Sequence, residues 1–359
     1  MKKKILVVDD SALMRRVICD IINSDNRFEV VDKATNGLEA FDLLNRNHYD
    51  AVVLDVNMPK MNGLQLLQEL QKYKIPAKIM MASTDTSEGA QITLEALELG
   101  AMDFIHKPDN AFECRVDDFK QEMLRILNAL ANSSLPVFET SNQRVQNTSK
   151  VQKVVAHTDT QTVKTRGKKL VAIASSTGGP KALQAVIPKL PKNLDAPVLI
   201  VQHMPKGFTA TLAERLNTLS EIEVKEATEG DVLKPGQVYL ARGGMHMKVS
   251  KSSRNGYVIH YSDEPSREGV KPCANYMYES LTETNFDEIV CVVMTGMGAD
   301  GMVGIRNLEE KKKVHVIAQN QESCIVYGMP KSVVNAGLSD RVVPLDEIAQ
   351  EIILNVGVK

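Results

Sequence analysis

The segment KILVVDD (residues 4–10) is a short apolar run that ends in two aspartates. Four further apolar runs follow, at residues 30–34, 51–54, 78–81 and 104–105, and stretches with helical spacing separate them. Continuous apolar runs of this length are typical of strands that are buried on both faces of a parallel sheet. Strands that alternate with helices predict a doubly wound α/β domain over about the first 125 residues.

Polar side chains follow these predicted strands. Asp9 and Asp10 come after the first run, Asp55 after the third, Ser83 after the fourth and Lys107 after the fifth. Ligand sites in doubly wound sheets form at the carboxyl ends of the strands. Each aspartate alone is more often a turn or cap residue, but five such residues at one edge predict a phosphoryl and Mg²⁺ site.

The middle of the chain has a different composition. Residues 132–169 are rich in Ser, Thr, Gln, Asn and Val, and they show neither a helical nor a strand period. Such a segment is typical of a flexible linker. The predicted division is a first domain at residues 1–128, a linker at 129–168 and a second domain at 169–359.

The second domain also reads as α/β. Apolar runs at residues 171–173, 198–201, 289–294 and 314–318 predict strands of a Rossmann-like, doubly wound parallel sheet. Two shorter runs, Gly236 to Ala241 and Met247 to Ser250, flank Gly243-Gly244 and predict a β-hairpin insertion.

Three polar residues follow predicted strands of this second sheet. Ser176 stands at a strand-to-helix turn, His203 follows the next strand, and Asp300 follows a later one. A nucleophile, a base and an orienting carboxylate at one sheet edge predict acyl-transfer chemistry. Taken singly, Ser176 and Asp300 read as helix caps and His203 as a loop histidine. Ser175 is a neighbouring candidate for the nucleophile.

Two other classes of function stay open at this point. Residues 296–301 read GMGADG and match the dinucleotide fingerprint G-x-G-x-x-G, with Glu322 about twenty residues further on. Asp300 inside that loop would repel a pyrophosphate, and the interpretation leaves Ser176 and His203 without a role. A catalytically inactive docking module is the other alternative.

The overall composition excludes several classes. The 359 residues carry a formal charge of −2, and neither a basic stripe nor a helix-turn-helix pattern follows the linker, so no nucleic-acid partner is expected. The apolar run after Met1 is too short for a signal peptide or a membrane insertion. Five scattered cysteines then predict a reduced, cytoplasmic protein. The protein is also expected to be a monomer.

The first domain resembles the two-component response-regulator receiver, on VVDDS (residues 7–11), LDVNMP (54–59), Asn62-Gly63 and Lys107-Pro108. The resemblance implies that a histidine kinase donates a phosphoryl group to Asp55. It also implies that Mg²⁺ binds Asp10, Asp55 and the carbonyl of Asn57, with Asp9 contributing through water. Ser83 and Lys107 would bind the phosphate, and Phe104 would be the aromatic switch residue.

The second domain resembles the chemotaxis protein-glutamate methylesterases, on IASSTGGP (residues 173–180), QHMPKGFT (202–209), TGMGADG (295–301) and YGMP (327–330). The resemblance implies that Ser176 is the nucleophile, His203 the base and Asp300 its orienter. Met297 would supply an oxyanion amide, and Thr177 would support the site. No cofactor is implied for the esterase.

The resemblance also has two departures. Ala174-Ser175 stands where the family usually has Gly-Ala, and residues 272–275 read PCAN where the family usually has PSVD. The implied function is a phosphorylation-activated hydrolase that removes methyl groups from chemoreceptor glutamates and also deamidates receptor glutamines. The unphosphorylated receiver is expected to cover the active-site face.

Overall fold

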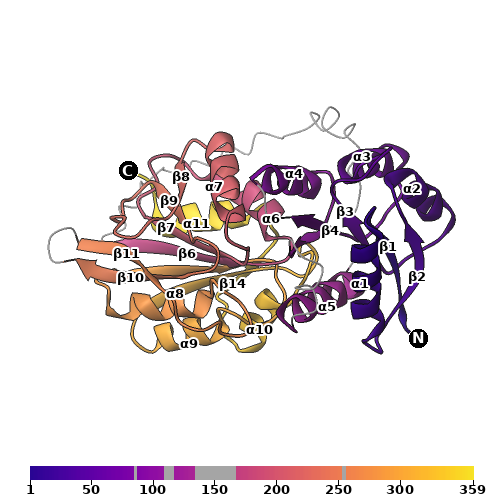
Figure 1. Ribbon diagram of the computed structural model, residues 1–359. Helices are drawn as coiled ribbons and strands as arrows, with labels where there is room; N and C mark the ends of the chain where they lie inside the picture. Colours follow the sequence, from indigo (N-terminus) through magenta and orange to yellow (C-terminus); the bar gives the residue numbers. More distant parts are fainter. Residues whose placement is uncertain (85–86, 109–116, 134–166, 253–255) are drawn as a thin grey trace, which may run out of the picture.

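The computed structural model describes residues 1–84, 87–108, 117–133, 167–252 and 256–359, and its elements form two α/β units (Figure 1). Most of the linker expected at residues 129–168 lies outside the described residues. The last helix of the first unit continues to Asn132, past the expected boundary at 128, because Leu130 and Ala131 are buried in its core. Within the described ranges, none of the helices is long and apolar enough to cross a membrane.

The first unit has one parallel sheet in the order β2-β1-β3-β4-β5, which confirms the doubly wound prediction. The order reverses at β1, so the switch point lies between β1 and β3. The elements are β1 (Lys3–Val8), α1 (Ala12–Asn23), β2 (Phe28–Ala34), α2 (Gly37–Arg46), β3 (Ala51–Asp55), α3 (Gly63–Tyr73), β4 (Ile79–Thr84), α4 (Ser87–Glu98), β5 (Asp103–Lys107) and α5 (Asp117–Asn132).

Local chemistry explains where the first helices start. The Ser11 side chain accepts the N–H of Met14 and caps α1, and Asn62 forms a capping box with Gln65 at the start of α3. A side chain at Gly63 would place its Cβ 2.5 Å from the carbonyl oxygen of Asp55. Only glycine therefore lets α3 begin directly beside the end of β3.

The second unit has a larger parallel sheet in the order β14-β13-β12-β6-β7-β9-β8. Its switch point lies between β6 and β12. The elements are β6 (Lys169–Ser175), α6 (Gly179–Val186), η2 (Ile187–Lys189), β7 (Val198–Gln202), α7 (Phe208–Leu219), β8 (Glu223–Glu226), β9 (Gln237–Leu240), β10 (His246–Ser252), β11 (Gly256–Ser262), α8 (Ala274–Ser280), η3 (Leu281–Glu283), β12 (Glu288–Val293), α9 (Met302–Glu309), β13 (Lys313–Gln319), α10 (Met329–Asn335), β14 (Arg341–Val343) and α11 (Ile348–Val356).

The hairpin insertion and both predicted strands are present, but the predicted pairing of these two strands was wrong. β9 pairs in parallel with β7 and β8 inside the main sheet, whereas β10 pairs antiparallel with β11. The Gly243-Gly244 turn therefore connects the sheet to the hairpin. A Cβ on Gly243 would lie 2.3 Å from the carbonyl oxygen of Pro205. Glycine at this position therefore lets the turn pack directly against the loop after β7.

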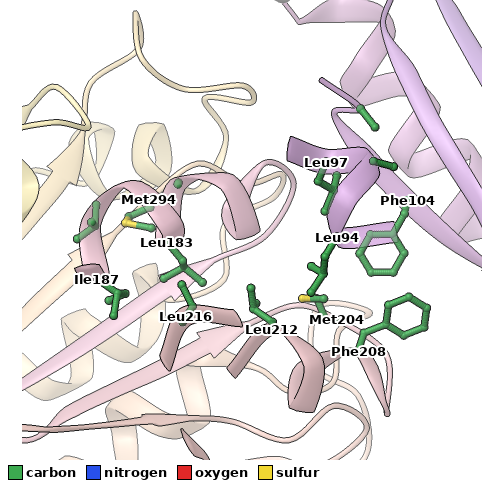
Figure 2. Packing of buried hydrophobic residues seen from close by; sticks show 14 of the residues in the cluster. Leu94, Leu97, Phe104, Leu183, Ile187, Met204, Phe208, Leu212, Leu216 and Met294 are labelled. Carbon is green, nitrogen blue, oxygen red and sulfur yellow. The ribbon is translucent and has the colours of Figure 1, made fainter. Parts of the chain in front are cut away.

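The two units share an apolar interface. Leu94 and Leu97 of α4 belong to the same buried cluster as Leu183 of α6 and Leu212 of α7 (Figure 2). The rings of Phe104 on β5 and Phe208 on α7 are stacked, with centroids 4.8 Å apart. At the rim, the guanidinium of Arg215 pairs with the carboxylate of Glu98 at 2.9 and 3.1 Å. In Figure 1, α4 and α5 are the helices of the first unit that face the second.

Candidate phosphorylation and esterase sites

The predicted acidic site lies at the switch point of the first sheet. Asp9 and Asp10 follow β1, Asp55 ends β3, and one carboxylate oxygen from each lies within 4.8 Å of the others. Asp9 and Asp55 are buried, whereas Asp10 is exposed. The Nζ of Lys107, at the end of β5, lies 2.6 Å from Asp55 Oδ1 and 3.1 Å from Asp9 Oδ2.

Asp55 is a buried carboxylate, and the positive charge of Lys107 only partly offsets the cost of burying its negative charge. Burial raises its pKa, the charge and hydrogen bond of Lys107 lower it, and the charge of Asp9 raises it again, with a result of about 6. Its hydrogen bonds from Lys107 and from the Val56 N–H both go to Oδ1. Among the described residues Oδ2 has no donor, so this oxygen is the one available to a phosphoryl group or a cation.

The donor set fits a hard divalent cation. Three carboxylate oxygens that converge beside a single ammonium leave excess negative charge, and oxygen ligands are what Mg²⁺ prefers. Asn57 is exposed two residues after Asp55, which places its backbone at the same edge. Ser83 is buried on β4, whose neighbouring residue Ala82 pairs with Asp55.

The predicted serine lies at the switch point of the second sheet. Ser176 directly follows β6, and its N–H donates to the carbonyl of Thr295, just after β12, at 3.0 Å. A Cβ on Gly296 would lie 2.8 Å from the Ser176 Cβ, so the backbone of the loop after β12 touches the serine. The His203 N–H donates to the Ser175 carbonyl at 3.1 Å, which attaches the histidine loop to the same strand end.

His203 is paired with the predicted carboxylate. Its Nε2 lies 2.8 Å from Asp300 Oδ2, and both side chains are almost fully buried. Nδ1 of His203 is buried and has no hydrogen-bond partner within the described part of the chain. The Ser176 hydroxyl makes no hydrogen bond to a described residue either. Because a carboxylate orients the ring through Nε2, Nδ1 is the nitrogen left to act as a base.

Asp300 is a buried carboxylate that protein hydrogen-bond donors surround. Burial alone would raise its pKa, but hydrogen bonds from His203, the Cys273 thiol and the Ala274 N–H, together with the charge of His203, lower it to about 2. The carboxylate therefore stays ionised across the physiological range. Burial and the Asp300 charge raise the pKa of Cys273, which keeps this thiol protonated and excludes it as the nucleophile.

The choice between the two adjacent serines follows from their partners. The Ser175 hydroxyl donates to Gln202 Oε1 at 2.7 Å, and the Gln202 amide donates to the Ser176 carbonyl at 3.0 Å. A Cβ on Gly179 would lie only 1.9 Å from that same Oε1. Ser175 thus belongs to a closed structural network, and Ser176 carries the available hydroxyl.

The two supporting residues lie on the loops around Ser176. Thr177 is buried, and its carbonyl accepts the Thr295 hydroxyl at 3.0 Å. The Met297 N–H donates no hydrogen bond to any described residue, as an oxyanion donor requires before substrate binds. The Asp300 carboxylate faces His203 and the start of α8.

A cleft between the two units leads to the histidine. It encloses about 590 Å³ and has residues 203–205, Ser266 and residues 268–271 along one side. The other side is formed by three residues of α5 in the first unit, namely Gln121, Glu122 and Arg125. A second hollow of about 400 Å³ lies further along α5, between Asn128 and Met297. Helix α5 therefore faces both the histidine loop and Met297 of the loop after β12.

Sequence reasoning missed part of this site. Gln202, Cys273 and Asn275 are buried and fix the three predicted residues through hydrogen bonds. Gln202 could have been noticed because it directly precedes His203 at the strand end. Cys273 and Asn275 lie in a segment whose distance from Asp300 in the chain gives no signal of their contact.

Comparisons with known proteins identify the families of both units. The model of the CheB methylesterase family matches residues 171–352, and that of the response regulator receiver domain matches residues 5–115. A relative from Syntrophomonas wolfei, named protein-glutamate methylesterase/protein-glutamine glutaminase 1, is 43% identical over 357 residues, which cover 98% of this chain and 99% of that protein. A Bacillus subtilis protein named protein-glutamate methylesterase/protein-glutamine glutaminase is 42% identical over 351 residues, covering 97% of each.

A solved structure supports the fold of the second unit. The CheB methylesterase catalytic domain of Thermotoga maritima is 40% identical, with a TM-score of 0.51, and the match covers 53% of this chain and 99% of that chain. The relatives match over nearly the full length, and the two family models divide the chain as the structure does. The chain therefore belongs to the CheB methylesterase family, with a response regulator receiver domain in front of the methylesterase domain.

Proposed function

We propose that this chain hydrolyses γ-glutamyl methyl esters on chemoreceptors, deamidates receptor glutamines at the same site, and is activated by phosphorylation of Asp55. One observation carries the proposal. His203, which is paired with Asp300 and whose N–H donates to the Ser175 carbonyl next to Ser176, lines a cleft whose opposite wall is the receiver helix α5. This cleft supports a proposal in which the receiver controls access to the catalytic histidine.

The geometry supports a serine hydrolase mechanism. The Ser176 hydroxyl attacks the ester carbonyl, and His203 accepts its proton at Nδ1 while Asp300 stabilises the charged ring through Nε2. The Met297 N–H donates to the developing oxyanion, and buried Thr177 supports the serine turn. His203 returns the proton to the leaving methoxide, and methanol departs. Water then attacks the acyl-enzyme to release the glutamate carboxylate. A glutamine side chain follows the same course with ammonia as the leaving group.

The receiver supplies the control. A phosphoryl group on Asp55 Oδ2 would add oxygens within reach of Lys107 and Ser83, at the ends of β5 and β4. Asp9, Asp10, Asp55 and the Asn57 carbonyl would hold the Mg²⁺ that neutralises this charge. A chemotaxis histidine kinase would be the phosphodonor.

A short physical path joins the phosphorylation site to the interface. β5 carries Lys107 at one end and, three residues earlier, Phe104, which stacks on Phe208 of the esterase unit. Movement of Lys107 toward a phosphate would shift β5 and weaken this contact. An open arrangement, in which α5 leaves the cleft, would then become more populated.

The test measures methanol release from methylated chemoreceptor, with and without acetyl phosphate and Mg²⁺. We expect the phosphodonor to raise the rate by about tenfold, which corresponds to about 1.4 kcal/mol in the opening equilibrium. A fragment of residues 167–359 should show the raised rate without phosphodonor. The Thermotoga maritima catalytic domain, solved as a separate chain, supports independent folding of such a fragment. No methanol release under any condition would refute the esterase, and a fragment no faster than the full chain would refute the inhibition.

A further inference from the structure

The Asp300 carboxylate is held almost entirely by one short segment. Oδ1 accepts the Cys273 thiol at 3.0 Å and the Asn275 N–H at 2.9 Å, and Oδ2 accepts the Ala274 N–H at 2.6 Å. Cys273 is the N-cap of α8 but makes no side-chain capping bond to it, so Asp300 takes that place from outside the helix. His203 is the fourth donor, and three of the four therefore come from residues 273–275.

A second histidine fixes this segment from behind. His246, at the start of β10, has no solvent exposure, and its Nδ1 accepts the Cys273 N–H at 3.2 Å. Its Nε2 lies 3.2 Å from the Pro265 carbonyl oxygen, which can only accept, so the proton of the neutral ring is on Nε2. Burial lowers the pKa of His246 and keeps it neutral. His246 thereby fixes the position of the Cys273 backbone independently of the contact between the thiol and Asp300.

The Asn275 side chain fixes the other partner of the contact. Its Oδ1 accepts the N–H of Gly301 at 3.1 Å and that of Gly304 at 2.6 Å, both just after Asp300. A Cβ on Gly304 would lie 2.7 Å from the Asn275 Cα, so α8 and α9 approach each other as closely as glycine permits. The backbone segments that carry the Cys273 thiol and the Asp300 carboxylate are thus both fixed by hydrogen bonds and close packing.

We propose that Cys273 is a positioning residue of the esterase, whose thiol holds the Asp300 carboxylate in line with the His203 ring. The inference rests on the proposed function and concerns its geometry. The thiol is fully buried, and it donates to the Asp300 oxygen that does not meet His203. Without this donor the Asp300 carboxylate could rotate, and its oxygens would exchange their remaining hydrogen-bond donors. The His203 ring would then lose its alignment as the base.

The experiment compares Cys273→Ala and Cys273→Ser with Cys291→Ala, which removes an equally buried thiol from β12 of the same domain. Two rates are measured: labelling of Ser176 by a fluorophosphonate, and methanol release from methylated chemoreceptor as kcat and KM. We expect C273A to lower the labelling rate and kcat by about tenfold with KM unchanged, since it removes one hydrogen bond to a charged group. C273S should stay within about threefold of the parent chain because the hydroxyl also donates, and C291A should match the parent chain.

Three results would overturn the inference. C273A could label at the parental rate, C273A and C273S could lose activity equally, or C273A and C291A could fall together. If C273A does not fold, Cys273→Val removes the donor while filling the space of the thiol with an apolar side chain. The same tenfold loss is expected, and normal labelling would contradict the inference. If the parent chain labels but releases no methanol, the proposed substrate is wrong, while the labelling rates still decide the role of Cys273.

Discussion

The receiver and the esterase each place a buried aspartate at the switch point of a parallel sheet, and the two carboxylates behave in opposite ways. Burial dominates at Asp55 and raises its pKa to about 6, whereas four donors around Asp300 overcome burial and lower its pKa to about 2. Asp55 accepts two hydrogen bonds, both on one oxygen, with a second carboxylate nearby. Asp300 accepts two on each oxygen.

The difference follows from what each carboxylate must do. Asp55 is the proposed nucleophile toward phosphorus, so one oxygen has to stay free and a cation has to be attracted. Asp300 reacts with nothing, and its saturated shell holds the His203 ring in one orientation. The same architecture supports both roles because the loops, and not the strands, supply the donors.

The largest expected effect tests the esterase side of the comparison. Ser176→Ala should lower methanol release by about 10⁴-fold or more, because the nucleophile is lost. Ser175→Ala is the matched control, since it removes only the hydroxyl bonded to Gln202, and its kcat should stay within about fivefold. A Ser175→Ala chain that is inactive beside an active Ser176→Ala chain would reverse the assignment.

The second effect tests the receiver side. Asp55→Asn should abolish the stimulation by acetyl phosphate, about tenfold by the proposal, and leave the basal rate unchanged, because the amide cannot accept a phosphoryl group. Asp50→Asn, at a surface carboxylate paired with Lys3 in the same domain, should retain the stimulation. If acetyl phosphate still stimulates methanol release by the Asp55→Asn chain, the phosphorylation site lies elsewhere.

A third, smaller effect tests how the two sites are coupled. Phe104→Ala should raise the basal methanol release by about threefold to tenfold, because the stacking on Phe208 is worth about 0.5–1.5 kcal/mol beyond the apolar area that it buries. Phe41→Ala is the control, since that ring contacts Tyr73 within the receiver. An unchanged basal rate in the Phe104→Ala chain would show that this contact does not restrain the esterase.

The smallest effect concerns the rim of the interface. Arg215→Ala removes the pair with Glu98, whose side chains are about one-third exposed, and should raise the basal rate by less than about twofold. Adding salt to the parent chain should have a similarly small effect, while salt should not change the Arg215→Ala chain. A large increase would mean that charge, and not the apolar contact, holds the units together.

The sequence by itself was enough for the five strands of the first sheet, for the central strands of the second sheet and for the polar residues that follow them. Apolar runs ending in polar residues mark parallel strands, and the carboxyl ends of such strands meet at one edge whatever the loops do. This is why Asp9 and Asp55 come together in one unit and Ser176, His203 and Asp300 in the other. Strand pairing was harder, and β9 was assigned to the hairpin because a short apolar run does not show its neighbour.

Only the tertiary structure decided how these residues are held and joined. Cys273 reaches Asp300 because α8 and α9 pack closely, and α5 lines the cleft at His203 because α4 docks against α6 and α7. Neither contact has a period or a fixed spacing in the chain. Each depends on surfaces that exist only after the elements have folded, whereas the strand-end residues follow from local pattern alone.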